Sequence, residues 1–412
     1  MRKPLFLLCL VLVALLLPLH AHASGYAVYE WSARGTALGG AMVARDADPS
    51  SVAYNPANIT DLPGTQVQVG ATAIKPAADM DFKSSSVKDR EFSDSIWGLP
   101  SAYLTKQLDD HYWFGFGMFS RVGLGTDYSG GDSWAGRYNC SYAGIQSMTF
   151  NPNLAMKFSD QFSLAMGVEA TYLRFMYKST IQPPINVEQD IDADGWAYGL
   201  NAGARYKPYD WLAFGLAWRS QVDLKVNGDV DFSKKGAYPA PARGDISGTE
   251  PLPESLTFGV MVKPIDRLSL EADVVWTRWS AYEALTMNYD PPLLNAYPTV
   301  SKEKNWNNTW RFQFGAEYAL TDSVDLRAGY VYDQSPINDK YEDFAVPCSD
   351  RQIVSVGAGW KVDQNWVVDV FYGYLWMVDR HYDARPVNYI NYEVEREDAH
   401  AHMAGLSVTY KF

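Results

Sequence analysis

The chain is poor in cysteine, with three among 412 residues, so it is not a small disulfide-stabilised scaffold. Basic residues are also in deficit: 35 Lys and Arg stand against 48 Asp and Glu, giving a formal net charge of −13. Nucleic acid is therefore excluded as a partner, because phosphate binding needs a basic face. Long apolar runs are missing beyond the N-terminus, which excludes a helical membrane protein with several spans.

Aromatic residues, by contrast, are abundant: they make up 14% of the chain, with 27 Tyr and 14 Trp. This share is heavy for a soluble enzyme of this length. The hydrophobic fraction of 47% is too high for a disordered protein.

The N-terminus has the pattern of an export signal. Two basic residues open the chain, an apolar run covers residues 5–17, and Ala21-His22-Ala23 forms a small-x-small cleavage site. We therefore expect a signal peptide over 1–23 and a mature N-terminus at Ser24. The alternative is an uncleaved anchor helix, for which the apolar run is short. Export places the mature protein most simply in a Gram-negative cell.

The remaining sequence alternates with a period of two, which predicts β-strands with one apolar face. Over 405–412, for example, Leu406, Val408, Tyr410 and Phe412 alternate with small or polar residues. Short turns alternate along the chain with longer polar connections, which is typical of an outer-membrane barrel. A soluble sandwich would also alternate. It would not place aromatic residues at both ends of most apolar faces, or Arg and Glu on the opposite face without a wet interior.

We expect an all-β fold, a 14-stranded antiparallel transmembrane β-barrel over residues 65–412. An even strand number suits a bacterial single-chain barrel, and closure removes the cost of unpaired backbone groups in hydrocarbon. If Phe412 ends at the periplasm, the short turns are periplasmic and the long loops extracellular. The predicted strands cover 65–76, 97–106, 111–122, 145–158, 161–178, 195–207, 211–226, 254–264, 267–284, 306–319, 324–334, 351–362, 366–379 and 399–412.

Residues 24–64 do not alternate and are rich in Gly, Ala and Ser. Asp48 followed by Pro49 predicts a helix start, and Pro56 ends that helix within about two turns. Because a barrel of this size would otherwise hold an open channel, we expect this segment to be a hatch inside the lumen. Inward-facing glycines would leave room for it. The alternative is a loose periplasmic tail, with the glycines serving barrel curvature.

Two sets of inward-facing residues are candidates for ligand contact. An apolar path in the outer half of the barrel is predicted for Phe119, Leu173, Phe175, Tyr177, Trp279, Phe371 and Leu375, unless these side chains only pack on the hatch. The second set consists of basic residues that share the lumen with Glu169, Glu271, Asp273, Glu317, Asp325 and Asp369. We expect these basic residues to form a paired ionic belt that anchors the hatch, while one of them could accept a carboxylate; they are Arg205, Arg219, Arg311 and Arg327.

The two cysteines of the mature chain, Cys140 and Cys348, fall in the second and sixth extracellular loops of this topology. In an exported protein this placement favours a disulfide between them. A nucleophile elbow, a zinc motif and a phosphate loop are all missing from the sequence, so we expect no metal, no cofactor and no enzyme activity.

A series of short motifs resembles the FadL/TodX family of outer-membrane transporters for long-chain fatty acids and other hydrophobic compounds. Each is weak alone, but their order across nearly the whole mature chain is specific. They are Ser24-Gly25-Tyr26, Ser32-Ala33-Arg34-Gly35, Ser50-Ser51-Val52-Ala53-Tyr54-Asn55-Pro56-Ala57, Gly123-Leu124-Gly125-Thr126-Asp127-Tyr128, Gly136-Arg137-Tyr138, Trp218-Arg219-Ser220, Leu252-Pro253-Glu254-Ser255, Trp276-Thr277-Arg278-Trp279-Ser280, Asn305-Trp306-Asn307-Asn308-Thr309-Trp310 and Leu326-Arg327-Ala328-Gly329-Tyr330.

The resemblance implies a hatch and a kinked third strand that opens a side exit toward the bilayer. Here that strand is 111–122, which contains Gly115 and Gly117, and glycine permits such a bend. The family's Asn-Pro-Ala maps onto Asn55, Pro56 and Ala57, which would sit against the kink. One departure concerns the helical outer loops of the family, because the connection 179–194 is short and polar.

These expectations combine into a passive outer-membrane channel for hydrophobic molecules, most simply long-chain fatty acids, with lateral release at the third strand. An aromatic-hydrocarbon channel of the same family and a non-transporting structural or adhesive barrel are the alternatives. A lipid enzyme would need a Ser or Asp facing a His at the lipid interface, and the sequence offers no such set. Expected partners are hydrophobic small molecules, outer-membrane lipid and lipopolysaccharide, and the barrel-assembly machinery through the strand that ends at Phe412. The channel is expected to be a monomer.

Overall fold

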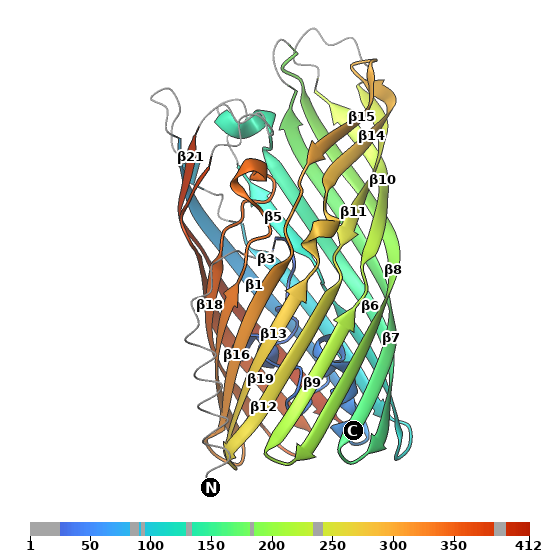
Figure 1. Ribbon diagram of the computed structural model, residues 1–412, viewed down its shortest axis with the longest axis vertical. Coiled ribbons are helices and arrows are strands. Elements are labelled where there is room, and N and C mark those ends of the chain that lie inside the picture. Colours follow the sequence, from blue (N-terminus) through green and yellow to red (C-terminus); the bar gives the residue numbers. More distant parts are fainter. Residues whose placement is uncertain are drawn as a thin grey trace.

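The computed structural model describes residues 25–82, 90–91, 95–128, 134–181, 185–233, 242–382 and 393–412. The predicted signal peptide and Ser24 lie outside these residues. The described chain forms one tall barrel of antiparallel strands (Figure 1). The first and last strands close it, because they pair from Gln66 with Lys411 up to Phe82 with Val394.

The strands form antiparallel spans that follow one another around the wall in chain order, and some spans consist of two strands in line. Their bounds are β1 Thr65–Phe82, β2 Arg90–Glu91, β3 Trp97–Gln107, β4 Tyr112–Phe119, β5 Gly123–Asp127, β6 Tyr142–Ser159, β7 Phe162–Thr180, β8 Glu188–Tyr209, β9 Leu212–Arg219, β10 Val222–Phe232, β11 Arg243–Leu252, β12 Ser255–Ile265, β13 Leu268–Thr277, β14 Ala284–Leu293, β15 Tyr297–Glu303, β16 Thr309–Ala319, β17 Val324–Asp333, β18 Arg351–Lys361, β19 Trp366–Met377, β20 Arg380–Tyr382 and β21 Val394–Lys411.

Among the described residues these strands make fourteen spans, which confirms the predicted closed antiparallel barrel. Five spans consist of two strands in line: β4 with β5, β9 with β10, β11 with β12, β13 with β14, and β15 with β16. The helical elements are short: α2 Ala33–Ala37, α3 Ser51–Tyr54, η1 Pro56–Asp61, η3 Ala135–Tyr138, η4 Trp279–Ala281 and η5 Asp339–Tyr341. None of the helices in the described part of the chain is long and apolar enough to cross a bilayer.

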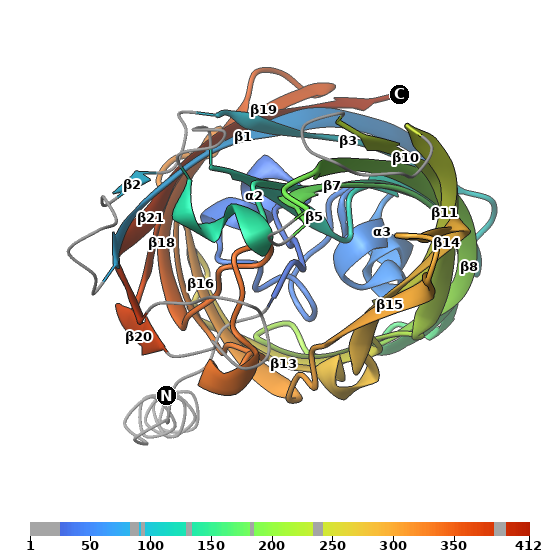
Figure 2. The same ribbon diagram turned by 90° about the horizontal axis from the view of Figure 1, so that it is seen from above.

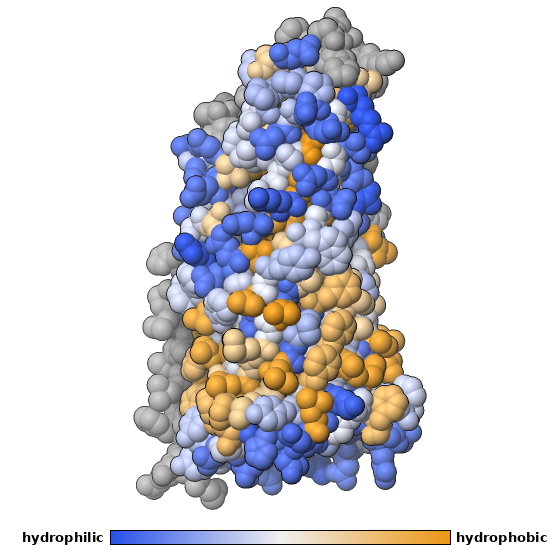
Figure 3. Space-filling view, turned by 90° about the vertical axis from the view of Figure 1, so that its right-hand side faces the viewer, coloured by the Kyte–Doolittle hydropathy of each residue, from blue (hydrophilic) through white to orange (hydrophobic). Residues whose placement is uncertain are grey.

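The outer surface is apolar near the periplasmic end and polar above it. Figure 3 shows apolar side chains gathered over the lower part of one face, and mostly hydrophilic residues over the upper part. Outward side chains of the lower band include Leu164, Met166, Leu200, Leu216 and Phe258, all exposed. Exposed apolar residues on a barrel wall face lipid, so this lower band is the membrane-spanning part.

Several strands extend further outward than their sequence pattern predicts. β8 begins at Glu188 rather than near 195, β10 continues to Phe232 rather than 226, and β14 and β15 form a hairpin in a region predicted to be mostly loop. The reason is that the wall above the membrane faces water, so its outward positions are charged instead of apolar. Lys178 pairs with Asp190 at 2.6 Å across β7 and β8, for example. Most of the connection expected at 179–194 is therefore strand.

Residues 25–64 lie inside the barrel, where α2 and α3 are seen within the ring of strands (Figure 2). Their side chains are buried over most of α2, α3 and η1. Ser32 caps α2, because its side chain accepts a hydrogen bond from Gly35 N at 3.0 Å. Asn55 caps η1 in the same way through Ala57 N, at 3.1 Å, and Pro56 occupies the first helical position. Small residues and short helices thus let this segment fill the lumen.

Candidate functional site at the broken third span

The third span is interrupted between β4 and β5. β4 pairs with β3 on one side, up to Ala102 opposite Met118, and with β6 on the other. β5 pairs with β6 but, in the described residues, not with β3. The wall therefore opens between residues 97–101 of β3 and residues 123–127 of β5.

The break lies at residues 120–122, at the end of the strand predicted over 111–122 and beyond the two glycines expected to permit the bend. Gly115 and Gly117 are both in β4 and have regular strand partners, Asn153 and Asn151 on β6. The absence of a side chain at these two positions instead leaves space for the N-terminal segment against the wall. A Cβ on Gly117 would lie 3.1 Å from Val52 Cγ1, so this glycine lets α3 approach the wall closely.

The N-terminal segment replaces β3 as the hydrogen-bonding partner of the break. Val28 N donates to Arg121 O at 3.0 Å, and Gly123 N donates to Tyr26 O at 3.0 Å. The indole Nε1 of Trp31 donates to Ser120 O at 2.7 Å. Backbone groups left unpaired in an apolar wall cost several kcal/mol each. These three bonds offset part of that loss where the span bends.

A cavity of about 640 Å³ occupies the space beside the break. Its inner wall is formed by Gly25, Ala27, Val28 and Glu30 of the N-terminal segment, and its outer side by residues 96–100 and by Val122, Gly123 and Gly125. Apolar residues of β1, β6 and β21 complete it, including Ile74, Ile145 and Met403. The cavity therefore lies between the N-terminal segment and the two strand edges that bound the gap.

Charged groups stand at the inner and upper edge of this cavity. Arg351 pairs with Asp333 at 2.9 Å, and Arg396 pairs with Glu342 at 2.9 Å. Glu342 lies in the loop between β17 and β18, outside the membrane, where burial raises the pKa of its carboxyl although Arg380 and Arg396 oppose the shift. Arg396 Nε is buried and has no hydrogen-bond partner among the described residues.

The predicted apolar path is divided among three clusters. Leu173, Phe175, Tyr177 and Trp279 are buried together in the largest one, in the outer part of the barrel. Phe371 and Leu375 pack with α2, and Phe119 packs with α3 and Trp31. Leu375 is the member of the predicted set that also lines the cavity at the break. The structure therefore brings four of the seven residues together and separates the other three.

The segment Asn55-Pro56-Ala57 is placed against β8. Asn55 Nδ2 donates to Ala204 O at 3.0 Å and to Val43 O at 2.7 Å. A Cβ on Gly203 would lie 2.1 Å from Asn55 Oδ1 and 3.0 Å from Pro56 Cδ. Because Gly203 has no side chain, this turn can pack directly against β8.

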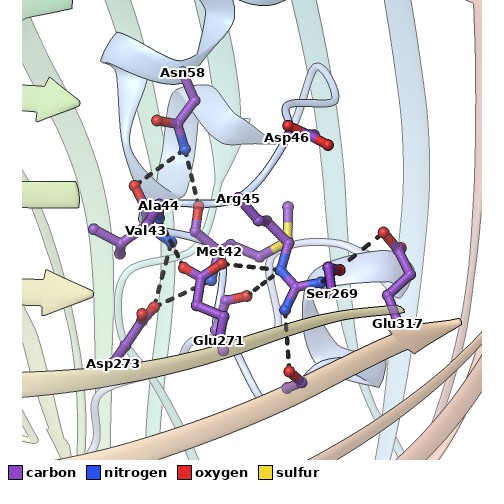
Figure 4. A network of polar contacts seen from close by, with 12 residues as sticks. Met42, Val43, Ala44, Arg45, Asp46, Asn58, Ser269, Glu271, Asp273 and Glu317 are labelled. Atoms are coloured by element: carbon purple, nitrogen blue, oxygen red, sulfur yellow. Dashed lines mark hydrogen bonds and ion pairs between the residues drawn. The ribbon is translucent and has the colours of Figure 1, made fainter. Parts of the chain in front are cut away.

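Two carboxylates on β13 hold the loop 42–45 of the N-terminal segment (Figure 4). Asp273 accepts hydrogen bonds from Met42 N at 3.1 Å and Val43 N at 3.3 Å. Glu271 accepts from Ala44 N at 2.7 Å and from Arg45 Nε at 3.1 Å. The Arg45 and Glu271 side chains are only 1% and 0% exposed, so this is a buried ion pair. The loop is therefore fastened by charge as well as by packing.

The four predicted basic residues have different partners. Arg205 pairs with Asp61 and donates to Ala44 O at 3.1 Å, and Arg219 pairs with Glu169 and donates to Ala53 O. Arg327 pairs with both Glu317 and Asp369 at 2.6 Å. The guanidinium of Arg311 lies 3.9 Å from the ring centre of Tyr29, without an ion pair among the described residues. Three of the four thus contact the N-terminal segment.

Several charged residues that hold the N-terminal segment in the lumen were not recognised from the sequence. Arg34 binds both carboxylate oxygens of Glu317, at 2.9 and 3.0 Å, and Arg121 pairs with Glu169 at 2.6 Å. Arg34 and Arg45 lie in a segment without strand periodicity, so no pattern gave the direction of their side chains. Their isolation in a Gly- and Ala-rich stretch was the available signal, because a charge buried there requires a partner.

The predicted disulfide is wrong. Cys140 and Cys348 are both thiols, each buried in the outer apolar cluster, and burial raises the pKa of both. The two loops are instead joined by a hydrogen bond from Phe344 N to Asn139 Oδ1 at 2.9 Å. Both cysteines lie at the same end of the barrel, as predicted from the loops that carry them, but this placement does not bring their sulfur atoms together. Within the described residues, no group of three or more His, Cys, Asp or Glu could hold a metal ion.

Replacing Gly115 by valine is expected to destabilise the packing of α3 and η1 against β4. A Cβ at this position would lie 2.8 Å from both Val52 Cγ2 and Ile59 Cδ1. Because overpacking costs about 1–3 kcal/mol, we expect a lower urea midpoint, followed by the gel shift between folded and unfolded barrel. Gly98→Val is the matched control, since nothing lies within 4 Å of the Cβ position of Gly98. Equal urea midpoints for the two variants would contradict close packing of α3 and η1 on Gly115.

Comparison with known proteins agrees with this architecture. The family model described as outer membrane protein transport protein (OMPP1/FadL/TodX) matches residues 14–412. A putative outer membrane protein of Neisseria meningitidis is 27% identical over 456 residues, covering 95% of this chain and 95% of that protein. The long-chain fatty acid transport protein of Escherichia coli is 23% identical over 459 residues, covering 100% of both.

Solved structures show the same fold. A FadL homologue of Pseudomonas aeruginosa superposes with a TM-score of 0.80 at 21% identity, over 94% of this chain and 100% of the other. The toluene transporter TodX of Pseudomonas putida gives 0.75 at 17% identity, over 95% and 99%. The chain therefore belongs to the OMPP1/FadL/TodX family, and it is a channel for hydrophobic compounds in the outer membrane of Gram-negative bacteria rather than an enzyme.

Proposed function

We propose that this channel takes up long-chain fatty acids and releases them sideways into the bilayer through the gap between β3 and β5. The N-terminal segment acts as a hatch that blocks the lumen to polar solutes. The process is passive, and each molecule leaves along its concentration gradient. The channel works as a monomer, inserted by the barrel-assembly machinery through the strand that ends at Phe412, with lipid and lipopolysaccharide around its wall.

The observation that carries this proposal is the cavity beside the broken span. Its volume of about 640 Å³ falls within the roughly 300–1,000 Å³ of ordinary ligand pockets. Its lining includes Ala27, Val28 and Glu30 of the N-terminal segment, and Ile96, Gly98 and Pro100 at the start of β3. An apolar molecule that leaves here enters lipid directly and does not cross the polar periplasmic end.

The charges at the cavity's edge favour an acid over a plain hydrocarbon. Arg351 and Arg396 line the cavity, and Arg396 Nε has a hydrogen to donate that finds no acceptor in the described structure. A carboxylate arriving there would satisfy this donor, and hydrogen bonds to charged groups are worth about 1.5–3 kcal/mol. The Escherichia coli relative, named as a long-chain fatty acid transport protein, agrees with this choice. An aromatic hydrocarbon is the second candidate, supported by the structural likeness to a toluene transporter.

Uptake by whole cells separates these candidates. Gram-negative cells that lack their own fatty-acid channel keep the lipopolysaccharide barrier, and would be given either this chain or an empty vector. We expect labelled oleate to enter several times faster with the chain, and labelled toluene to enter at the same rate in both. Faster toluene entry with unchanged oleate entry would favour the hydrocarbon channel. No change for either compound would favour a structural or adhesive barrel.

A further inference from the structure

The gap in the wall has two facing strand edges with different side chains. On the β3 edge, Trp97 and Leu99 share the inward parity of Ser101 and Tyr103, which are buried. On the β5 edge, Gly123 and Gly125 are the facing residues, and all four line the cavity. Passage through the gap therefore takes place between two large apolar side chains and two glycines.

The two halves of the gap are filled to different degrees. A Cβ on Gly123 would make a tight contact of 3.3 Å with Val28 Cγ2 of the N-terminal segment, but it would lie 4.0 Å from Leu99 Cδ2 across the gap, which is ordinary packing distance. A Cβ on Gly125 would be 2.0 Å from Trp97 Cε2 and 2.1 Å from Cζ2, so the indole lies directly on the Gly125 backbone. The gap is thus closed most tightly where the Trp97 ring covers Gly125.

The Trp97 ring is held there by packing. Its backbone is fixed, because Trp97 pairs with Ile74 on β1 at the end of a regular ladder. Its Nε1 is buried but has no hydrogen-bond acceptor among the described residues. Trp31, by contrast, is tied to the same break by a hydrogen bond of 2.7 Å from its Nε1 to Ser120 O. Rotation of the Trp97 ring away from Gly125 breaks no hydrogen bond, whereas rotation of the Trp31 ring does.

We propose that Trp97 is a gate residue of the lateral outlet, and that it selects plain acyl chains over molecules with fused rings by cross-section. An extended chain, one methylene wide, passes beside the indole after a small rotation. A molecule carrying a fused ring system needs the whole width that the indole occupies, and is held back. This inference rests on the lateral route proposed above, and it adds the residue that determines which molecules can use it.

The test compares two fatty acids that differ in width. Palmitate has a plain chain, and 12-(1-pyrenyl)dodecanoic acid carries four fused rings at its end. Uptake of each is measured in the channel-deficient cells described above, with the natural chain, Trp97→Ala, Trp97→Phe, and Trp310→Ala as a control. Trp310 is an exposed, lipid-facing tryptophan on β16, away from the gap.

We expect Trp97→Ala to raise uptake of the pyrenyl acid roughly tenfold, the discrimination that one misfitting group typically provides, while palmitate uptake changes less than about twofold. Trp97→Phe should give an intermediate ratio, and Trp310→Ala the natural one. An unchanged ratio in folded Trp97→Ala, with palmitate entering normally, would overturn the gate and leave the transport function standing. Absence of palmitate uptake by the natural chain would overturn both. Should Trp97→Ala fail to assemble, the ratio in Trp97→Phe decides, because it keeps an aromatic ring against β5.

Discussion

Removing the carboxylate of Glu271 should loosen the N-terminal segment and make the barrel leaky to small polar solutes. Glu271 holds both Ala44 N and the guanidinium of Arg45, and both side chains are almost fully buried. Losing one partner of a buried ion pair costs about 3–5 kcal/mol, because the other charge remains buried and uncompensated. Glu317, 3.9 Å from Arg45, would compensate only in part.

Conductance across a planar bilayer measures this effect. With Glu271→Ala we expect frequent open-channel events and a cleavable N-terminal segment on limited proteolysis, and with Glu271→Gln a weaker form of both. Asp322→Ala is a suitable control, because Asp322 is a fully exposed acid in the turn between β16 and β17. A Glu271→Ala channel as silent and as protease-resistant as the control would show that packing alone holds the hatch.

Leu99→Arg should stop fatty-acid uptake while the barrel still assembles. Leu99 lines the cavity at the gap, where the indole and the two glycines leave little water to solvate a charge. Its backbone pairs with Thr72 of β1, and a side-chain change leaves that ladder intact. A charge in an apolar membrane site costs about 2.5–3.5 kcal/mol, so we expect uptake of labelled oleate to fall at least tenfold.

Leu99→Met is the matched variant, because it conserves volume and apolar character and should keep near-natural uptake. Assembly of both variants is verified by the gel shift of the folded barrel. Normal oleate uptake by an assembled Leu99→Arg barrel would rule against lateral release. It would point instead to a route past the hatch into the periplasm.

The part of the fold that touches lipid was the part that the sequence could predict. There the outward face is apolar, as with Leu164, Met166 and Val168 on β7, so alternation marked each span. Above the membrane both faces meet water or polar partners. Strand residues such as Asp190 and Asp192 were consequently placed in a loop, although they pair with β7.

The candidate site was harder to predict, because it depends on contacts between distant segments. Glycines near the third strand did indicate a bend. Its position at 120–122, however, is determined by hydrogen bonds with Tyr26, Val28 and Trp31, nearly a hundred residues earlier. Inward parity identified Glu271 and Asp273 as lumen carboxylates, but it could not supply Arg45 as the partner, since the loop that carries Arg45 has no period.

The residues from Gly25 to Glu30 belong to two structures at once. They form the inner side of the ligand cavity, and they continue directly into the segment that fills the lumen. Occupancy of the cavity and the position of the N-terminal segment are therefore thermodynamically linked. A molecule that binds one arrangement of these residues more tightly shifts the equilibrium toward that arrangement by the ratio of its two affinities. By reciprocity, an agent that displaces the N-terminal segment changes the affinity of the cavity for a bound molecule by the same factor as that molecule changes the affinity for the agent.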